Sequence, residues 1–298
     1  MRPIYKILFS LSVVMVVASI ISLAAYGFNF GVDFKGGSVL ELDFTQRPAT
    51  AEVAKILNES NIANVKDAGV SPVGDSEIII KSGELSEKDH QDILAILKKA
   101  FLNTDTTEKR FDSVGPLIGN ELKNKSITAI IVVLVAISLY ITFVFKKLGR
   151  VLPAWVMGAA AIIALIHDLV IPMGIFAWLG AYKGVEISAV FVAAVLTILG
   201  YSISDTVVIF DRVRENILRG GSKEQFSEVV HQSIMQTLVR SLNTTLTTLL
   251  SLVTIYFFGG ESVKYFALAL ILGISLGAFS SIAVASPILV WWSRRRAG

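Results

Sequence analysis

Residues 7–28 read ILFSLSVVMVVASIISLAAYGF, and no charged side chain lies between Lys6 and Asp33. A helix of this length crosses the roughly 30 Å hydrocarbon core of a bilayer. The segment therefore predicts a membrane-spanning helix at the start of the chain. A secretory signal peptide is the alternative, because Arg2 and Lys6 resemble its basic start. We favour a retained membrane helix, since the apolar run is long for a signal peptide and no clear cleavage site follows.

Five further apolar runs follow along the chain, and each is long enough to span a membrane. They cover residues 126–145, 151–179, 187–210, 241–258 and 265–292. Only 17% of the 298 residues are charged and 53% are hydrophobic, whereas about a quarter of the residues of a soluble domain are charged. The sequence thus predicts a membrane α-helical protein with six transmembrane helices. The lack of cysteine excludes disulfides and zinc–thiolate sites, and no phosphate-binding loop is present.

Lysine and arginine are distributed unevenly over the short loops. If the N-terminus is cytoplasmic, the short outer loops carry only Lys183 and Lys264. Cytoplasmic loops carry the excess of basic residues, so we predict that both termini are cytoplasmic. The basic residues assigned to the cytoplasmic side are Arg2, Lys6, Lys146, Lys147, Arg150, Arg212, Arg214, Arg219, Lys223, Arg294, Arg295 and Arg296.

Three regions follow from this topology. Residues 1–28 form the first transmembrane helix, and residues 29–125 form a periplasmic, extracytoplasmic domain. Residues 126–298 form a five-helix transmembrane region with a cytoplasmic amphipathic loop at 211–239.

The periplasmic region carries its own pattern of strands and helices. Alternating or apolar residues predict strands at 39–44, 64–70, 78–80 and 109–114. Helical spacing predicts helices at 49–59 and 86–102, with Ser86 as the N-cap of the second. The order βαββαβ is typical of an α+β ferredoxin-like domain, which names no function by itself. Acidic residues outnumber basic ones here, which excludes a basic face for nucleic acid.

Asp168, Asp205 and Arg240 are the charged residues within or at the edge of the predicted spans. A charge in hydrocarbon costs about 2.5–3.5 kcal/mol, so each must face protein or water. Helical spacing places Asp205 and Arg240 on two polar stripes, which predict a polar seam between the fourth and fifth spans. The other members of the two stripes are Thr197, Tyr201, Asn243, Thr244 and Thr247.

A seam with one carboxylate and one guanidinium suits proton transfer, because burial and a nearby cation act oppositely on the proton affinity of Asp205. Arg240 does not titrate and would serve as a tethered counter-ion. The alternative is a static ion pair that locks two helices together, and the residues alone leave both open. His167 and Asp168 pose a similar choice between a relay point and a structural polar group beside Pro172, and we favour the structural role.

Several glycines predict close packing or turns. Gly273 and Gly277 lie on a line of small residues spaced by four, which predicts a packing face against another helix. A turn from the first helix into the domain, or alternatively a hinge, is predicted at Gly31, Asp33, Gly36 and Gly37.

Histidines give no metal signal. The chain has only three, and they are too scattered to ligate one ion. We expect His90 and His231 to lie on a solvated surface.

Four stretches resemble motifs of the SecD/SecF family of protein-export membrane proteins. They are residues 31–37 (GVDFKGG), 200–216 (GYSISDTVVIFDRVREN), 240–244 (RSLNT), and 114–116 (VGP) with Gly119 and 121–122 (EL). The resemblance extends over essentially the whole chain, in the order of the SecF branch. Ser204 and Ser241 depart conservatively from the usual Asn and Thr.

The resemblance implies a membrane half like that of the resistance-nodulation-division superfamily and a place in the bacterial inner membrane. It implies an accessory subunit of the Sec translocase that uses the proton-motive force, with Asp205 and Arg240 linked to proton conduction. No cofactor, metal or covalent catalysis is implied, so the chain is not expected to be an enzyme. The implied partners are SecD as a separate chain, the SecYEG channel, YajC, the translocating polypeptide and the lipid bilayer. A passive scaffold, or half of another proton-coupled transporter, are the alternatives.

Overall fold

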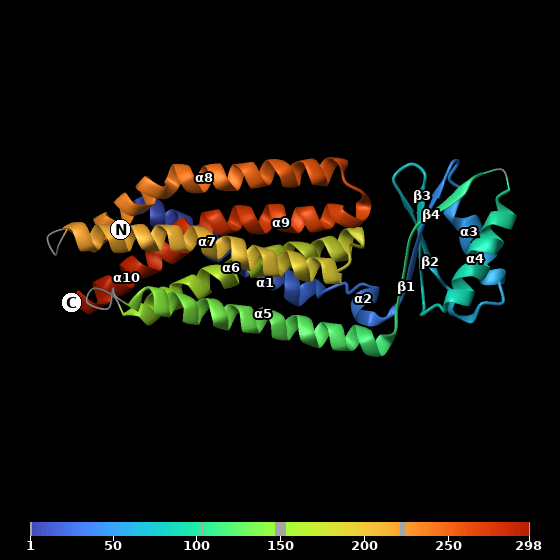
Figure 1. Ribbon diagram of the computed structural model, residues 1–298, viewed down its shortest axis with the longest axis horizontal. Coiled ribbons are helices and arrows are strands. Elements are labelled where there is room, and N and C mark those ends of the chain that lie inside the picture. The colour runs from blue at the N-terminus through green and yellow to red at the C-terminus, as the bar shows by residue number, and fades with distance from the viewer. Residues whose placement is uncertain (1, 103, 147–152, 221–224, 298) are drawn as a thin grey trace. The chain divides into compact units, whose positions relative to one another are not determined.

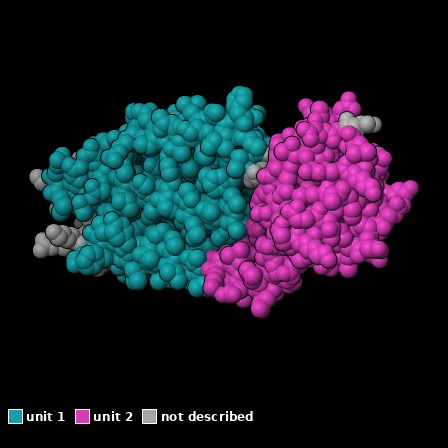
Figure 2. Space-filling model, turned by 45° about the vertical axis from the view of Figure 1, so that its right-hand side comes forward, with its two compact units in different colours: residues 1–29, 127–298 teal, residues 30–126 magenta. Residues whose placement is uncertain are grey.

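The computed structural model describes residues 2–102, 104–146, 153–220 and 225–297, except for the side chains of residues 220, 261, 262, 296 and 297. Three residues of the basic-residue distribution, Lys147, Arg150 and Lys223, lie outside the described residues, as does the side chain of Arg296. The chain divides into two compact units (Figure 2): Met1–Asn29 with Ile127–Gly298, and Phe30–Ser126.

The described residues contain six helical stretches that are long and apolar enough to cross a membrane, which confirms the predicted number. The first five are α1 (Pro3–Tyr26), α5 (Pro116–Val144), α6 (Ala154–Lys183), α7 (Ala189–Gly220) and α8 (Phe226–Phe258). The sixth is composite: α9 (Glu261–Ser280) continues through the π-helical segment η4 (Ser281–Ala285) into α10 (Ser286–Ala297) (Figure 1).

Small residues let the membrane helices pack closely against one another. Gly174 of α6 lies so near Ser19 of α1 that an added Cβ would come within 2.5 Å of it, and the Ser22 hydroxyl donates to the Gly174 carbonyl at 2.7 Å. The first helix is therefore packed into the bundle. On α9, Gly273 lies against Ile198 of α7 and Gly277 lies against Ser202. The line of small residues thus packs against a helix of the same chain.

Residues 211–239 are largely helical rather than an open loop. They comprise the last turns of α7 and the first turns of α8, on either side of residues 221–224, which lie outside the described residues. Val230 and Ile234 on the apolar side of α8 pack with Tyr5, Val213 and Val290. This side of the amphipathic stretch therefore covers the helix bundle.

The unit formed by Phe30–Ser126 has the predicted βαββαβ order. Its elements are β1 (Gly37–Phe44), α3 (Thr50–Glu59), β2 (Gly69–Val73), β3 (Glu77–Ser82), α4 (Glu87–Ala100) and β4 (Thr106–Val114). The strands form one antiparallel sheet in the order β2-β3-β1-β4, which confirms the ferredoxin-like fold. Leu40, Leu42, Val53, Ile78 and Ile93 form the centre of its core.

Local interactions explain where this unit follows or departs from the sequence-based predictions. Ser86 caps α4 in a capping box with Asp89, as its sequence predicts. The strand predicted at 64–70 is wrong for most of its length, because Ala63–Val65 (η1) forms a 3₁₀ turn. Asp67 then has a positive φ of 66° and its amide donates to Asn58 Oδ1, so β2 begins only at Gly69.

His90 and His231 are not simple surface residues, so that expectation is wrong. His90 is 4% exposed and stacks on Phe111 at 3.8 Å, with Glu87 and Glu108 beside its ring nitrogens. The His231 Nδ1 atom lies 2.6 Å from the Tyr5 hydroxyl. Isolated histidines carry no periodic signal, so their packing was not visible in the sequence.

Glu41 of β1 has a pKa raised above its ordinary value, by burial first and by the nearby Glu77 carboxylate second. Glu41 therefore binds its proton more tightly in the folded protein than in the unfolded protein. The free energy of unfolding decreases as the pH rises above 4.5, because Glu41 then ionises in a buried position. We expect Glu41→Gln to slow hydrogen exchange of the β1 amides at pH 7, and we expect the difference from the parent to vanish below pH 4.5. The exposed Glu52→Gln on α3 is the control, and equal effects of the two variants at pH 7 would contradict the prediction.

Candidate functional site

A polar groove of about 310 Å³ lies between α7 and α8. Asp205 of α7 is only 7% exposed and contributes its carboxylate to this groove, while Arg240 contributes its guanidinium from α8. The other lining residues are Tyr201, Ser204, Val208, Ser241, Thr244, Thr247 and Thr248. The structure thus brings the two predicted charged residues to one site.

The Asp205 carboxylate is surrounded by polar groups but is not saturated by them. The Ser241 and Thr245 hydroxyls and the Arg240 guanidinium lie near enough to act on its charge. Even so, neither Asp205 Oδ2 nor Thr245 Oγ1 makes a hydrogen bond among the described residues. One oxygen of this buried carboxylate is therefore left without a fixed partner among the described residues.

Arg240 does not form a direct ion pair with Asp205. Within the described ranges, the ion pairs of α7 join Asp211 to Arg214, and Glu215 to both Arg212 and Arg219. Arg240 therefore acts on the Asp205 carboxylate by Coulomb attraction, without a direct contact.

Tyr201 connects α7 to α8 about one helical turn before Asp205. Its hydroxyl donates to the Thr244 carbonyl at 2.9 Å and lies 3.2 Å from Thr248 Oγ1. Of the remaining predicted seam residues, Thr244 and Thr247 also line the groove. Thr197 and Asn243 do not: both are exposed, and Thr197 donates to the Ala193 carbonyl of its own helix.

A second groove, of about 470 Å³, continues the polar surface along α7 and α8. It shares Val208 and Arg240 with the first groove, so Arg240 stands where the two meet. Its other lining residues are Val207, Asp211, Arg212, Glu215, Gln236 and Thr237. The lining residues of the two grooves together extend from the charged end of α7 to Asp205.

Four polar residues at the groove were not predicted from the sequence. Ser241 and Thr248 of α8 and Ser204 of α7 were not assigned to the predicted seam, nor was Thr245 beside Asp205. Ser241 and Thr245 are spaced by four residues, so they form a second polar face next to the predicted stripe. That spacing was the available signal.

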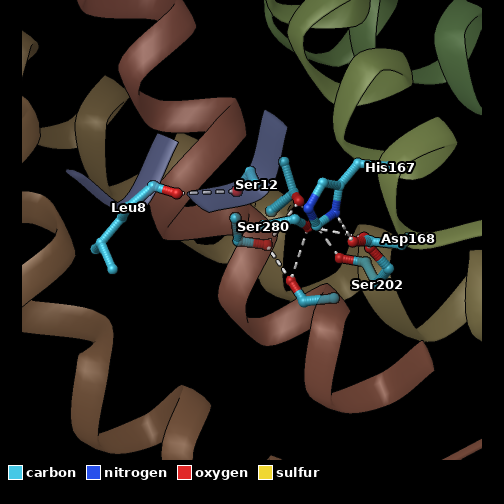
Figure 3. Close-up of polar contacts among 9 residues, drawn as sticks. Leu8, Ser12, His167, Asp168, Ser202 and Ser280 are labelled. Carbon is cyan, nitrogen blue, oxygen red and sulfur yellow. Dashed lines mark hydrogen bonds and ion pairs between the residues drawn. The ribbon is translucent and has the colours of Figure 1, made fainter. Parts of the chain in front are cut away.

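His167 and Asp168 of α6 lie in the core, at a junction of three helices (Figure 3). Asp168 is fully buried, and its Oδ2 accepts hydrogen bonds from Ser202 of α7 at 2.5 Å and from Ser280 of α9 at 2.7 Å. The His167 Nδ1 lies 2.9 Å from Asp168 Oδ1. The two serines were not predicted, because a serine in an apolar helix gives no indication of its partner.

The Asp168 cluster holds the side of α7 that faces the core. Ser202 precedes Asp205 by three residues, and the next residue, Thr206, lies 2.8 Å from Ser281, the first residue of the π-helical segment. Neither His167 nor Asp168 is among the lining residues of the two grooves. The cluster therefore lies on the buried side of α7 rather than on its groove side, and it fixes α7 against α6 and α9.

The predicted glycine turn begins the Phe30–Ser126 unit. Gly31 is the N-cap of the short helix α2 (Val32–Lys35), whose first turn contains Asp33. Gly36 and Gly37 have positive φ angles of 79° and 126° and lead into β1. An added Cβ on Gly36 would come within 2.7 Å of Pro116, and one on Gly37 within 2.7 Å of the Ser82 carbonyl.

The Gly36→Ala variant should therefore be strongly destabilised, since it combines a left-handed backbone with a collision against backbone atoms. We expect a loss of about 1–3 kcal/mol, seen as faster proteolysis of residues 30–126 in the membrane-embedded protein. Gly74→Ala is the matched control, because Gly74 also has a positive φ but nothing lies within 4 Å of its added Cβ. Equal sensitivity of the two variants would show that the close approach to Pro116 is unimportant.

Family profiles match the chain over most of its length. The C-terminal profile of the SecD/SecF protein-export membrane proteins matches residues 94–295, and the SecD/SecF GG motif matches residues 21–46, which include Gly36 and Gly37. The chain belongs to the SecD/SecF family. It is accordingly a multi-pass membrane protein of a protein-export family, as the sequence motifs predicted.

Members of this family are similar along the whole chain. The protein translocase subunit SecF of Thermobaculum terrenum is 38% identical, over 96% of this chain and 91% of that protein. The SecF subunit of Anaerolinea thermophila is 36% identical, over 95% and 91%. That of a Synechocystis strain is 35% identical, over 99% and 93%.

Solved structures of SecDF share the fold. The chain matches SecDF from Thermus thermophilus, described as a translocon-associated membrane protein, with a TM-score of 0.81 and 33% identity. A SecDF structure in a super-membrane-facing form gives a TM-score of 0.67 and 34% identity. Each match covers 98% of this chain, which spans 38% of the SecDF chain.

Proposed function

We propose that this chain is an accessory subunit of the Sec translocase that uses the proton-motive force, together with SecD, to promote protein translocation. The observation that carries the proposal is Asp205, a buried carboxylate on a polar groove whose Oδ2 has no hydrogen-bond partner among the described residues. Groups of this kind inside a membrane mark ion or proton pathways. The SecF relatives support the assignment to protein export.

In this proposal Asp205 accepts and releases the proton, and Arg240 sets how readily it does so. Arg240 stands at the meeting point of the two grooves, so a small shift of α8 changes its distance from the carboxylate. One charge that crosses a potential of 100 mV releases about 2.3 kcal/mol, which is the energy available per proton. The Tyr201 contact with α8 would carry the resulting helix movement, while the Asp168 cluster holds α7 in place against α6 and α9.

The same proposal includes the membrane setting and the partners. We place the chain in the bacterial inner membrane, with both termini cytoplasmic and the domain that begins near residue 30 in the periplasm. The uneven distribution of basic residues supports this orientation. We propose SecD as a separate partner chain, because SecF relatives of similar length match over nearly all of this chain. SecYEG, YajC and the translocating polypeptide are further proposed partners, and no covalent catalysis is proposed.

A passive scaffold is the second candidate. A static lock between α7 and α8 would be built most simply as a direct ion pair, whereas the described ion pairs do not join Asp205 to Arg240. A half-transporter for a small solute is less well supported, since the unit formed by Phe30–Ser126 is a single ferredoxin-like domain. The structural contacts of Asp168 favour the scaffold role for that residue only.

The test is export of a model preprotein into inner-membrane vesicles that lack endogenous SecF. Vesicles are supplied with this chain or left without it, and each is assayed with and without an uncoupler that collapses the proton gradient. The proposal predicts that the chain raises export only while the gradient is intact. An increase that survives the uncoupler in full would assign the chain to the scaffold.

A further inference from the structure

A groove of about 440 Å³ lies where α6 begins and α10 ends, apart from the site between α7 and α8. It is lined by Pro153, Trp155, Trp292 and Arg295. The segments that end here are two of the six membrane-spanning stretches, Ala154–Lys183 and Val263–Arg295. The groove therefore lies at the level where a spanning helix meets the polar headgroups of the bilayer.

Aromatic side chains form the walls of this groove. Trp155 packs edge-to-face on Trp292 with ring centroids 4.9 Å apart, and the Arg295 guanidinium stacks 4.0 Å from the centroid of Trp291. Trp155 and Trp291 remain about half exposed. Tryptophan prefers the headgroup level because its ring is apolar and its N–H is polar. Stacking on an aromatic ring also fixes the plane of the guanidinium while its N–H groups stay available.

Among the described residues, the groove carries positive charge that no carboxylate pairs with. Arg294 and Arg295 are exposed, and neither forms an ion pair within the described ranges. The first turn of α6 has Pro153 as its N-cap and no side-chain cap, so the positive end of the helix dipole adds to the charge of Arg295. An oriented arginine with free N–H donors is suited to bind phosphate.

We propose that this groove binds the phosphate headgroup of an anionic phospholipid. Arg295 would bind the phosphate, and the apolar faces of Trp155 and Trp292 would contact the glycerol and upper acyl chains. A soluble anion would need only the positive charge, whereas the tryptophan walls and the position at a helix end fit a lipid. The site is independent of the proton-transfer proposal, because it shares no residue with the two grooves of α7 and α8.

The tryptophan distribution provides a direct probe. Trp155 and Trp292 line this groove, and Trp291 stacks on its Arg295. The fourth tryptophan, Trp178, is in the last turns of α6 at its opposite end. The full chain with Trp178→Phe is purified in detergent, and its fluorescence is quenched by phosphatidylglycerol or phosphatidylcholine with brominated acyl chains. We expect saturable quenching in which phosphatidylglycerol binds at least about fivefold more tightly than phosphatidylcholine. Arg295→Gln in the same background should lose most of this preference.

Arg219→Gln, which removes an exposed arginine from the end of α7, is the matched control and should keep the full preference. Equal quenching by the two lipids in the parent protein would overturn the proposal without any variant. It would also be overturned if the Arg295→Gln variant kept the full preference, or if inorganic phosphate in the millimolar range displaced phosphatidylglycerol. The last result would assign the groove to a soluble anion.

Discussion

Replacing Asp205 by asparagine is expected to remove the gradient-dependent part of preprotein export, down to the level of vesicles without the chain. Asparagine has nearly the shape of aspartate but does not titrate, so it keeps the packing of α7 while it loses the proton-binding group. Asp205 Oδ2 has no hydrogen-bond partner among the described residues, so the substitution breaks no hydrogen bond at this atom and should destabilise the helix packing little. The measurement is export with and without uncoupler, at matched membrane levels of the variant and the parent.

The control for this variant is Glu228→Gln at the start of α8. Glu228 is exposed and pairs with Arg2, and exposed pairs of this kind contribute about 0–1 kcal/mol. Export by this variant should equal that of the parent and should remain sensitive to the uncoupler. If Asp205→Asn exports like Glu228→Gln, the carboxylate has no proton role and the scaffold becomes the better account.

Replacing Asp168 by alanine should cause the largest loss of stability of any single change in the membrane unit. The change leaves the Ser202 and Ser280 hydroxyls and the His167 ring without their buried acceptor, and each unpaired buried group costs about 1–3 kcal/mol. A cavity at the junction of α6, α7 and α9 adds to the loss. We expect a lower level in the membrane and a melting temperature in detergent reduced by several degrees.

Asp168→Asn separates the two roles proposed for this residue. The amide oxygen accepts from the same two serines, and the amide nitrogen donates to His167 Nδ1 once the ring carries its proton on Nε2, so a structural role predicts stability near that of the parent. Export should then also be near normal. A stable Asp168→Asn protein that loses gradient-dependent export would instead show that the charge or proton of Asp168 is used, and would make it a relay.

The membrane architecture was readable from sequence because hydrocarbon imposes a length and a composition on every span. The ferredoxin-like order was readable for a similar reason, since β1, β3 and α4 have strong periodic patterns. The weaker pattern near Val65 failed, because a 3₁₀ turn and a positive φ at Asp67 depend on local contacts. Asp205 and Arg240 could be picked out from the sequence because a charge in a membrane span is costly and must face protein or water.

The contacts behind the charged residues could not be predicted, because they join segments far apart in the chain. Ser202 and Ser280 reach Asp168 from two other helices, and nothing in an apolar helix marks such a serine. The π-helical segment after Ser280 is likewise a result of packing. On the predicted polar stripe of α8, Thr244 and Thr247 line the groove and Asn243 does not, since a stripe wider than the groove includes residues at its edge.

The most direct test of proton transfer at Asp205 is proton flux through proteoliposomes that contain the full chain with SecD and a pH-sensitive dye inside. An imposed pH gradient should decay several times faster with the parent chain than with Asp205→Asn, and Glu228→Gln should match the parent. Equal decay rates for the parent and Asp205→Asn would contradict the account, because the carboxylate would then carry no protons.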